Sequence, residues 1–130
     1  MMPWTELKYY RATKGFAPVL EFLDALGQKD RKAAIKCAAK IEVLGELGHE
    51  LRRPHADYLR DGIYELRVRV GRVNYRILYF FHGQDVIVLA HALTKEKEVP
   101  HADIERAIER KILFENNPAR HTFVEEDTHG

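Results

Sequence analysis

Residues 64–81 read YELRVRVGRVNYRILYFF, and residues 86–95 continue as VIVLAHALTK. Apolar and polar residues alternate on both sides of Gly71-Arg72, which predicts a β-hairpin with a two-residue type II′ turn. This turn fixes the register and places the apolar residues on one face, as the pairs Val70–Val73, Val68–Tyr75, Leu66–Ile77 and Tyr64–Tyr79. The other face carries the pairs Glu65–Leu78, Arg67–Arg76 and Arg69–Asn74.

Arg67 and Arg76 face each other directly in this register. Like charges at opposed positions destabilise a sheet, so a sequence selected only for folding would avoid them. Two guanidiniums side by side suit an anion such as phosphate, which matches the planar fork of arginine. In the alternative interpretation the face is merely solvated, and Glu65 and other carboxylates neutralise the arginines. Both interpretations stay open here, and removal of Arg67 is expected to leave stability unchanged or slightly raised.

The chain has 130 residues and suits one domain, which we expect to span residues 1–115, followed by a mobile acidic tail at 116–130. The net charge is only +1, but residues 51–76 hold seven arginines against three acidic residues, a local charge of +4. Residues 77–130 hold six basic and ten acidic residues, a local charge of −4. Positive charge is therefore concentrated on the hairpin and the segment before it, where it can steer a polyanion.

The sequence has no pattern that predicts a metal, a cofactor or a membrane segment. Cys37 is the single cysteine, so no intramolecular disulfide forms, and a reducing compartment is compatible with the chain. No Cys/His cluster has zinc-site spacing, and no glycine-rich loop suits a phosphate. The N-terminus lacks the apolar run of a signal peptide or transmembrane helix. We therefore expect a cytoplasmic protein without a metal or cofactor.

Two helices are predicted before the β-hairpin. Residues 7–12 suit a short edge strand, and Pro18 begins a helix that we expect to end at Gly27. A second helix is expected over residues 29–47, terminated by Gly48. Its apolar stripe comprises Ala34, Cys37, Ala38, Ile41 and Leu44. The two helices form a helical hairpin whose apolar sides need a partner, and the apolar face of the sheet supplies one.

The segments around the β-hairpin complete the expected fold. Residues 49–62, HELRRPHADYLRDG, are expected to form a loop. Residues 86–93 are apolar at nearly every position and predict a central strand covered on both faces. His91 shares its parity with Ile87, Leu89 and Leu93, which favours a core or half-buried histidine with one hydrogen bond over a catalytic one. Pro100 begins a final helix to about Glu115, with one side formed by Ile104, Ala107, Ile108 and Ile112.

Four segments together resemble a known family. They are PVLEFLDAL at 18–26, YLRDGIYELRV at 58–68, YRILYFF at 75–81 and VLAHALTKEKEVPHADIERA at 88–107. In this succession the chain resembles the HigB-type toxins of the RelE/ParE superfamily, and more narrowly their phage-derived branch. The resemblance implies an α+β, RelE-like fold. In that fold an N-terminal helical hairpin packs on a twisted, mainly antiparallel sheet, and a C-terminal helix follows.

The resemblance also implies a function. Toxins of this kind belong to type II toxin-antitoxin systems and inhibit translation by cleaving mRNA in the decoding site of the ribosome, without a metal. The RNA 2′-hydroxyl attacks the adjacent phosphate and leaves a 2′,3′-cyclic phosphate and a 5′-hydroxyl end. The implied partners are a cognate helix-turn-helix antitoxin, the ribosome and mRNA. Operator DNA is reached only through the antitoxin complex, and no membrane is involved.

The motifs of the family give four candidate catalytic residues in this sequence. Arg67 matches the arginine of the ELR motif and is the candidate for stabilising charge on the phosphate, and Arg76 matches the YR motif. Lys95 and Lys97 match the basic residues after the last strand and are candidates for proton transfer or phosphate binding. The candidates for binding RNA phosphates are Arg52, Arg53, His55, Arg60 and Arg69.

Two other functions stay open at this point. The near-neutral chain and its acidic second half also suit a toxin without nuclease activity that binds a protein target such as gyrase, as ParE relatives do. They also suit an inactive relative that binds only its antitoxin and operator DNA. The paired arginines with nearby lysines favour the nuclease. An acidic segment of the antitoxin is expected to cover the positive segment at residues 51–76.

Overall fold

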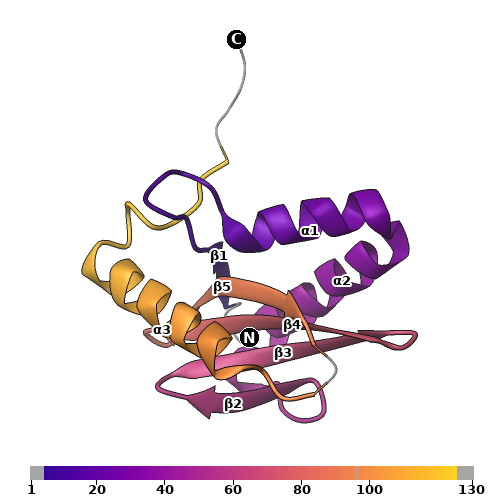
Figure 1. Ribbon diagram of the computed structural model, residues 1–130. Coiled ribbons are helices and arrows are strands. Elements are labelled where there is room, and N and C mark those ends of the chain that lie inside the picture. The colour runs from indigo at the N-terminus through magenta and orange to yellow at the C-terminus, as the bar shows by residue number, and fades with distance from the viewer. Residues whose placement is uncertain (1–4, 96, 126–130) are drawn as a thin grey trace.

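The computed structural model describes residues 5–95 and 97–125 as a five-stranded sheet between helices (Figure 1). The strands are β1 (Glu6–Tyr9), β2 (Ala56–Arg60), β3 (Ile63–Val70), β4 (Val73–His82) and β5 (Val86–Thr94). Their order is β1-β5-β4-β3-β2, with β1 parallel to β5 and the other pairs antiparallel. The helices are α1 (Pro18–Lys29), α2 (Arg31–Leu47), the 3-10 turn η1 (Gly48–Glu50) and α3 (His101–Asn116). This architecture confirms the expected α+β fold class. No helix in the described residues combines the length and hydropathy that crossing a bilayer requires.

The central hairpin of β3 and β4 has the register that the sequence predicts, from Tyr64 opposite Tyr79 to Val70 opposite Val73. Gly71 in the connecting turn has a φ of +62°, whereas the φ of Arg72 is not positive. A positive φ at the first central residue alone indicates a type II′ turn, because a type I′ turn needs it at both central residues. The apolar face of the hairpin is therefore set by alternation along the chain and by one glycine.

Helices α1 and α2 cover this apolar face. The shared core contains buried residues from both helices and four strands, among them Val19, Ile41, Leu44, Ala56, Leu66, Ile77, Tyr79, Ile87 and Leu89. Asp30 alone separates the two helices, and its carboxylate accepts a hydrogen bond from the Ala33 N–H at 3.1 Å. Helix α1 continues two residues past Gly27, the position where we expected it to end, and the Asp30 N–H closes its last turn by donating to the Leu26 carbonyl at 2.6 Å. The buried stripe of α2 includes Ala33, whereas Ala38 is exposed.

Strand β2 forms within residues 49–62, so the predicted loop is wrong for the middle of this segment. The strand pairs antiparallel with β3 at the edge of the sheet. Asp61 and Gly62 connect the two strands with φ values of +51° and +82°. Positive φ at both central positions is the type I′ geometry that an Asp-Gly pair favours. The Asp61-Gly62 pair is therefore a local sequence signal for the β2–β3 hairpin, which we did not predict.

Helix α3 covers the opposite face of the sheet (Figure 1). Its Ala107 and Phe114 are buried against residues of three strands, namely Ile63, Leu78, Phe80, Val88 and Ala90. Strand β5 is therefore covered on both faces, as its continuous apolar sequence predicts. Ile112 is exposed instead of packed, because the buried side of α3 passes through Ala107 and Phe114.

A β-bulge in β5 reverses the side to which the following residues point. Leu78 pairs with His91 and Tyr79 pairs with Leu89, so Ala90 is the extra residue. His91 therefore lies on the α3 side, while Leu89 packs on the side of α1 and α2. The parity that we expected the two residues to share is wrong, because the alternation along β5 is interrupted between them.

The expected hydrogen bonding of His91 is confirmed. Its Nε2 lies 2.7 Å from Asp103 Oδ1, and its Nδ1 lies 3.2 Å from Arg110 Nη1. Because the guanidinium can only donate, Nδ1 accepts and the neutral ring carries its proton on Nε2. Burial lowers the pKa of His91 below its ordinary value, and Arg110 acts in the same direction while the hydrogen bond to Asp103 opposes it.

We expect the folded protein to lose stability as the pH falls below about 6.5, the ordinary pKa of histidine. The unfolded chain then binds a proton at His91 more readily than the folded chain does, so protonation favours unfolding. Thermal unfolding between about pH 8 and pH 5 measures this dependence. The variant His91→Gln keeps a donor and an acceptor and should show a shallower dependence on pH. An unchanged slope in this variant would assign the dependence to other groups.

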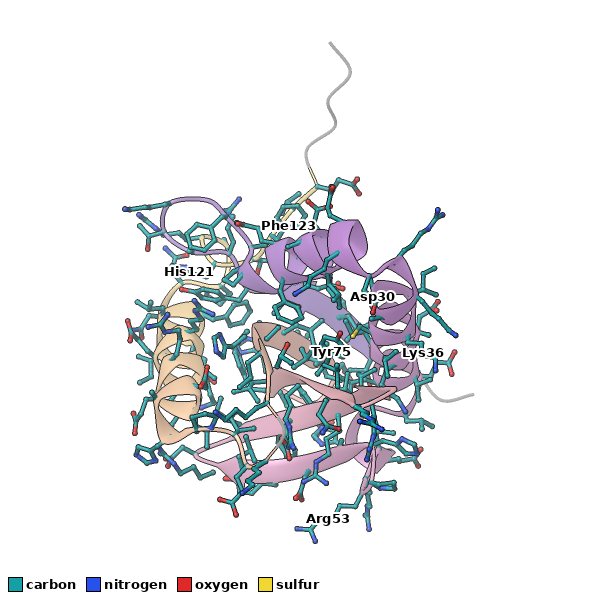
Figure 2. All side chains as sticks on the ribbon, turned by 45° about the vertical axis from the view of Figure 1, so that its right-hand side comes forward. Asp30, Lys36, Arg53, Tyr75, His121 and Phe123 are labelled. Atoms are coloured by element: carbon teal, nitrogen blue, oxygen red, sulfur yellow. The ribbon has the colours of Figure 1, made fainter. Side chains whose placement is uncertain are left out.

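Strand β1 lies at the edge of the sheet, as predicted, and the chain after α3 also contacts it. The Phe123 N–H donates to the Tyr9 carbonyl at 2.8 Å. His121 is buried, and its ring stacks on Tyr10 with 5.4 Å between the centroids (Figure 2). This part of the expected mobile tail is therefore packed against the domain, while the last five residues lie outside the described part of the chain.

Candidate functional site

Glu65 lies between the two opposed arginines and contacts both. Its Oε1 accepts a hydrogen bond from Arg67 Nε at 2.8 Å and lies 2.7 Å from Arg67 Nη2. Its Oε2 accepts a hydrogen bond from Arg76 Nη1 at 2.7 Å. The Glu65 side chain is only 2% exposed, whereas those of Arg67 and Arg76 are 39% and 12% exposed. The anion between the arginines is thus a buried carboxylate of the chain itself.

The contact of Glu65 with both arginines lowers the net positive charge that two opposed guanidiniums would otherwise place on this face. Their repulsion is offset because both contact one carboxylate at hydrogen-bond distance in a partly buried site. Glu65 also holds the two guanidiniums side by side and so acts as a positioning residue. Arg76 Nε is buried without a hydrogen-bond partner in the described residues. One donor of the pair is therefore left without a partner by the described fold.

An open hollow of about 440 Å³ lies over this cluster, between β2, β3 and the segment before α3. Its wall contains three arginines, three acidic residues, a tyrosine and three apolar residues: Arg60, Arg67, Arg76, Asp57, Glu65, Glu98, Tyr58, Leu59, Val99 and Ile104. The formal charges at the wall therefore cancel. The volume falls within the range of small-ligand sites, about 300–1,000 Å³. The hollow thus has room for a phosphate with its flanking sugars.

The other arginines near the hollow are also paired with carboxylates. Arg53 contacts Asp57 at 3.0 Å, and its hydrogen bond holds the pKa of Asp57 below the ordinary value. Arg60 contacts Glu105 and Asp61 at 2.7 Å each, and these hydrogen bonds raise the pKa of the guanidinium. Much of the positive charge that the sequence concentrates in this segment is therefore neutralised within the fold.

The structure brings only some of the candidate residues together. Arg60, Arg67 and Arg76 line the hollow described above. Arg52 and Arg53 line a second hollow of about 400 Å³ at the edge of β2, together with the exposed Tyr58 and the half-buried Tyr64. The candidates that line neither hollow are His55, Arg69, Lys95 and Lys97. The described residues contain no group of three or more His, Cys, Asp and Glu side chains placed to hold a metal ion.

Lys95 and Lys97 lie in the segment that joins β5 to α3. The Lys95 N–H donates to the Asn74 carbonyl at 3.1 Å, which ties this backbone to β4 two residues before Arg76. Both lysines are exposed, and Glu98 lines the hollow in their place. The role of the lysines in proton transfer stays a prediction.

The acidic side of the site is hard to recognise from the sequence. Glu65 shares a face with Arg67, but alternation alone does not predict that Glu65 is buried. Asp57 becomes a neighbour of Arg67 only because β2 pairs with β3. Glu105 reaches Arg60 across 45 positions because α3 packs over the same face. These contacts depend on an unrecognised strand and on helix packing, and the Asp61-Gly62 turn is the local signal that points to that strand.

The arginine cluster lies within the part of the chain that matches a known family. The family model described as phage-derived protein Gp49-like (DUF891) matches residues 21–112, which is 92 of the 130 residues. The match extends from α1 into α3 and includes Glu65, Arg67 and Arg76. No curated protein matches the sequence. The matched share of the chain shows that this protein belongs to the phage-derived Gp49-like family.

Proposed function

We propose that this protein is the toxin of a type II toxin-antitoxin system, of the phage-derived HigB kind. In this proposal it inhibits translation as a ribosome-dependent mRNA endoribonuclease. The main support is the pair of opposed arginines at the wall of an open hollow, held side by side by the buried Glu65. Membership of the Gp49-like family is compatible with a toxin.

The proposed reaction needs stabilisation of developing charge and two proton transfers. The RNA 2′-hydroxyl loses its proton, and its oxygen bonds to the adjacent phosphorus. The bond from phosphorus to the 5′-oxygen breaks, and this oxygen takes up a proton, which leaves a 2′,3′-cyclic phosphate and a 5′-hydroxyl end. Arg67 and Arg76 donate hydrogen bonds to the phosphate oxygens as charge grows on them. Lys95 and Lys97 are the proposed proton-transfer groups.

We expect purified mRNA to be cut poorly without ribosomes. The net charge is +1, and the arginines at the hollow already contact carboxylates, so attraction to a free polyanion is weak. The ribosome then supplies the substrate geometry. Expression of the protein alone in bacteria should arrest growth, and mapped transcripts should show new 5′ ends in frame with codons. Efficient cleavage of purified mRNA would contradict ribosome dependence, and normal growth with folded protein would contradict a toxin.

A toxin that binds a protein target such as gyrase, without nuclease activity, is the second candidate. The contacts of Arg67 and Arg76 with Glu65 favour it, because they satisfy the arginines without any RNA. The same expression experiment separates the two candidates. An SOS response with intact mRNA would indicate the gyrase-type target, whereas in-frame cleavage would indicate the nuclease.

The proposal includes a protein partner. A helix-turn-helix antitoxin encoded beside this protein would neutralise it in the cytoplasm and connect it to operator DNA. Co-expression should yield a complex that purifies as one species and no longer arrests growth. Separate elution of the two folded products would contradict the pairing.

A further inference from the structure

The outer side of α2 carries an apolar ridge next to a ridge of lysines. Four apolar residues recur at every fourth position, namely Ile35, Ala39, Val43 and Leu47. The two large side chains at the ends of this ridge, Ile35 and Leu47, are 58% and 41% exposed. Three lysines form the neighbouring ridge, namely Lys32, Lys36 and Lys40. Side chains at these spacings share one side of a helix, so the seven residues form one surface, the α2 outer face. Val43 is half-buried against the core, and the exposed Glu42 and Glu46 lie on the side of the apolar ridge away from the lysines.

Charge pairing distinguishes the α2 outer face from the hairpin. Within the described residues, its lysines form no salt bridge with a carboxylate, and Lys40 Nζ contacts only His55 Nδ1, at 2.8 Å. Lys36 lies on the outer side of α2 (Figure 2). In contrast, carboxylates neutralise four arginines in and beside the hairpin, namely Arg53, Arg60, Arg67 and Arg76. Positive charge open to a partner is therefore present on α2, in addition to the exposed Arg52, Arg69 and Arg72 of the segment at residues 51–76.

We infer that the α2 outer face docks an acidic, amphipathic helix of the antitoxin. The inference rests on the proposed function for the existence of that partner. The apolar side of the partner helix covers Ile35 and Leu47, and its carboxylates contact the lysines. The 17 residues of α2 provide a contact of about 25 Å. Ridges of side chains four residues apart pack into the grooves of a second helix, and complementary charges set the register and speed association.

Two other occupants fit this surface less well. In an antiparallel pair of α2 helices related by a two-fold axis, Lys32 would face the C-terminal half of the other copy, but Lys40, near the middle of the helix, would lie close to Lys40 of that copy. Like charges would then lie together. An RNA backbone would contact the lysines but leave Ile35 and Leu47 in water, whereas exposed apolar side chains beside charges suit a protein contact. An acidic amphipathic helix satisfies both the charges and the apolar ridge.

The test measures binding of the full-length protein to the product of the adjacent antitoxin gene by titration calorimetry at two salt concentrations. We expect Lys32→Glu/Lys36→Glu to weaken binding by about tenfold or more and to reduce its salt dependence. The control Lys14→Glu/Arg120→Glu makes the same change in net charge at exposed positions outside α2 and should change the affinity by less than about twofold. Ile35→Ser should weaken binding by about fivefold and leave the salt dependence unchanged.

All substituted residues are exposed, so each variant should melt like the wild type. Unchanged affinity of the α2 variants would overturn this inference and leave the antitoxin pairing intact. Failure of the wild-type protein to form any complex would overturn both. Normal antitoxin affinity with loss of ribosome-dependent cleavage would assign the lysines to RNA. A dimer that the lysine variant abolishes would assign the face to a second copy, and either result overturns the inference.

Discussion

Replacement of Arg67 with alanine is expected to abolish the growth arrest caused by this protein. Arg67 is the more exposed arginine of the pair, and it lines the open hollow. Loss of a contact that stabilises charge only in the transition state costs about 3 kcal/mol, which slows cleavage about a hundredfold. Growth curves after induction and cleavage of ribosome-bound mRNA measure the effect.

A melting curve separates this catalytic role from a structural one. Because Arg67 contacts the buried Glu65, Arg67→Ala is expected to destabilise the fold by about 1 kcal/mol. Because of this contact with Glu65, a loss of stability replaces the expectation from sequence that stability holds or rises. Arg67→Lys should restore activity only in part, since an ammonium does not reproduce the fork. Arg72→Ala, an exposed arginine in the turn of the same hairpin, is the control and should change neither quantity. Full toxicity of a folded Arg67→Ala protein would remove Arg67 from the proposed mechanism.

Replacement of Glu65 with alanine is expected to have the largest effect on stability, a loss of about 3–5 kcal/mol. The substitution removes the carboxylate that both guanidiniums contact, and Arg76 is then a nearly buried charge without a partner. The two arginines also repel each other once the carboxylate is gone. In a domain of this size, such a loss lowers the melting temperature by about 10 °C or more.

Two further variants complete the Glu65 experiment. Glu65→Gln keeps the shape and an acceptor oxygen but removes the charge, so its melting temperature should fall between those of the wild type and Glu65→Ala. Glu42→Ala removes an exposed glutamate on α2 and should melt like the wild type. If Glu65→Ala melted at the wild-type temperature, the arginines would not depend on Glu65 for their placement.

The central β-hairpin could be predicted residue by residue because two independent signals agree there. Alternation identifies the apolar face of each strand, and Gly71 limits the turn to a geometry that allows one pairing. Burial of the helical hairpin on that face follows, since its apolar sides need a partner and the alternating strands present one. Most of the fold could therefore be predicted because strong local signals, the alternation and the turn glycine, agree with one another.

Two features of the sheet could not be predicted in the same way. Strand β2 contains Asp57 and no β-branched residue, so its own propensity is low and its pairing with β3 decides its structure. The bulge at Ala90 has no marker in residues 86–93, which are apolar on both faces of the strand apart from His91, yet it changes the side on which His91 lies. Tertiary packing determines both features, and neither is encoded by local alternation.

The candidate site was predictable only as a set of residues on one face. The predicted register correctly placed Arg67 opposite Arg76, and it placed Glu65 on the same face of the hairpin. The choice between a free anion site and internal neutralisation depends on burial, because a carboxylate with little exposure to water holds its partners far more firmly than a solvated one. Burial of Glu65 comes from the whole packed face, to which no single motif points.

The bridging carboxylate also affects how the protein would discriminate among the RNAs of a cell. Because Glu65 already neutralises part of the charge of Arg67 and Arg76, their contact with RNA neutralises little phosphate charge and releases few of the counterions condensed on the RNA. The entropic gain that drives unselective adsorption of basic proteins to RNA is then small, and affinity at this face varies little with ionic strength. Selection of RNA at this face then depends less on overall charge and more on the conformation in which a strand is presented. Non-specific binding of the protein to abundant transcripts is correspondingly weak.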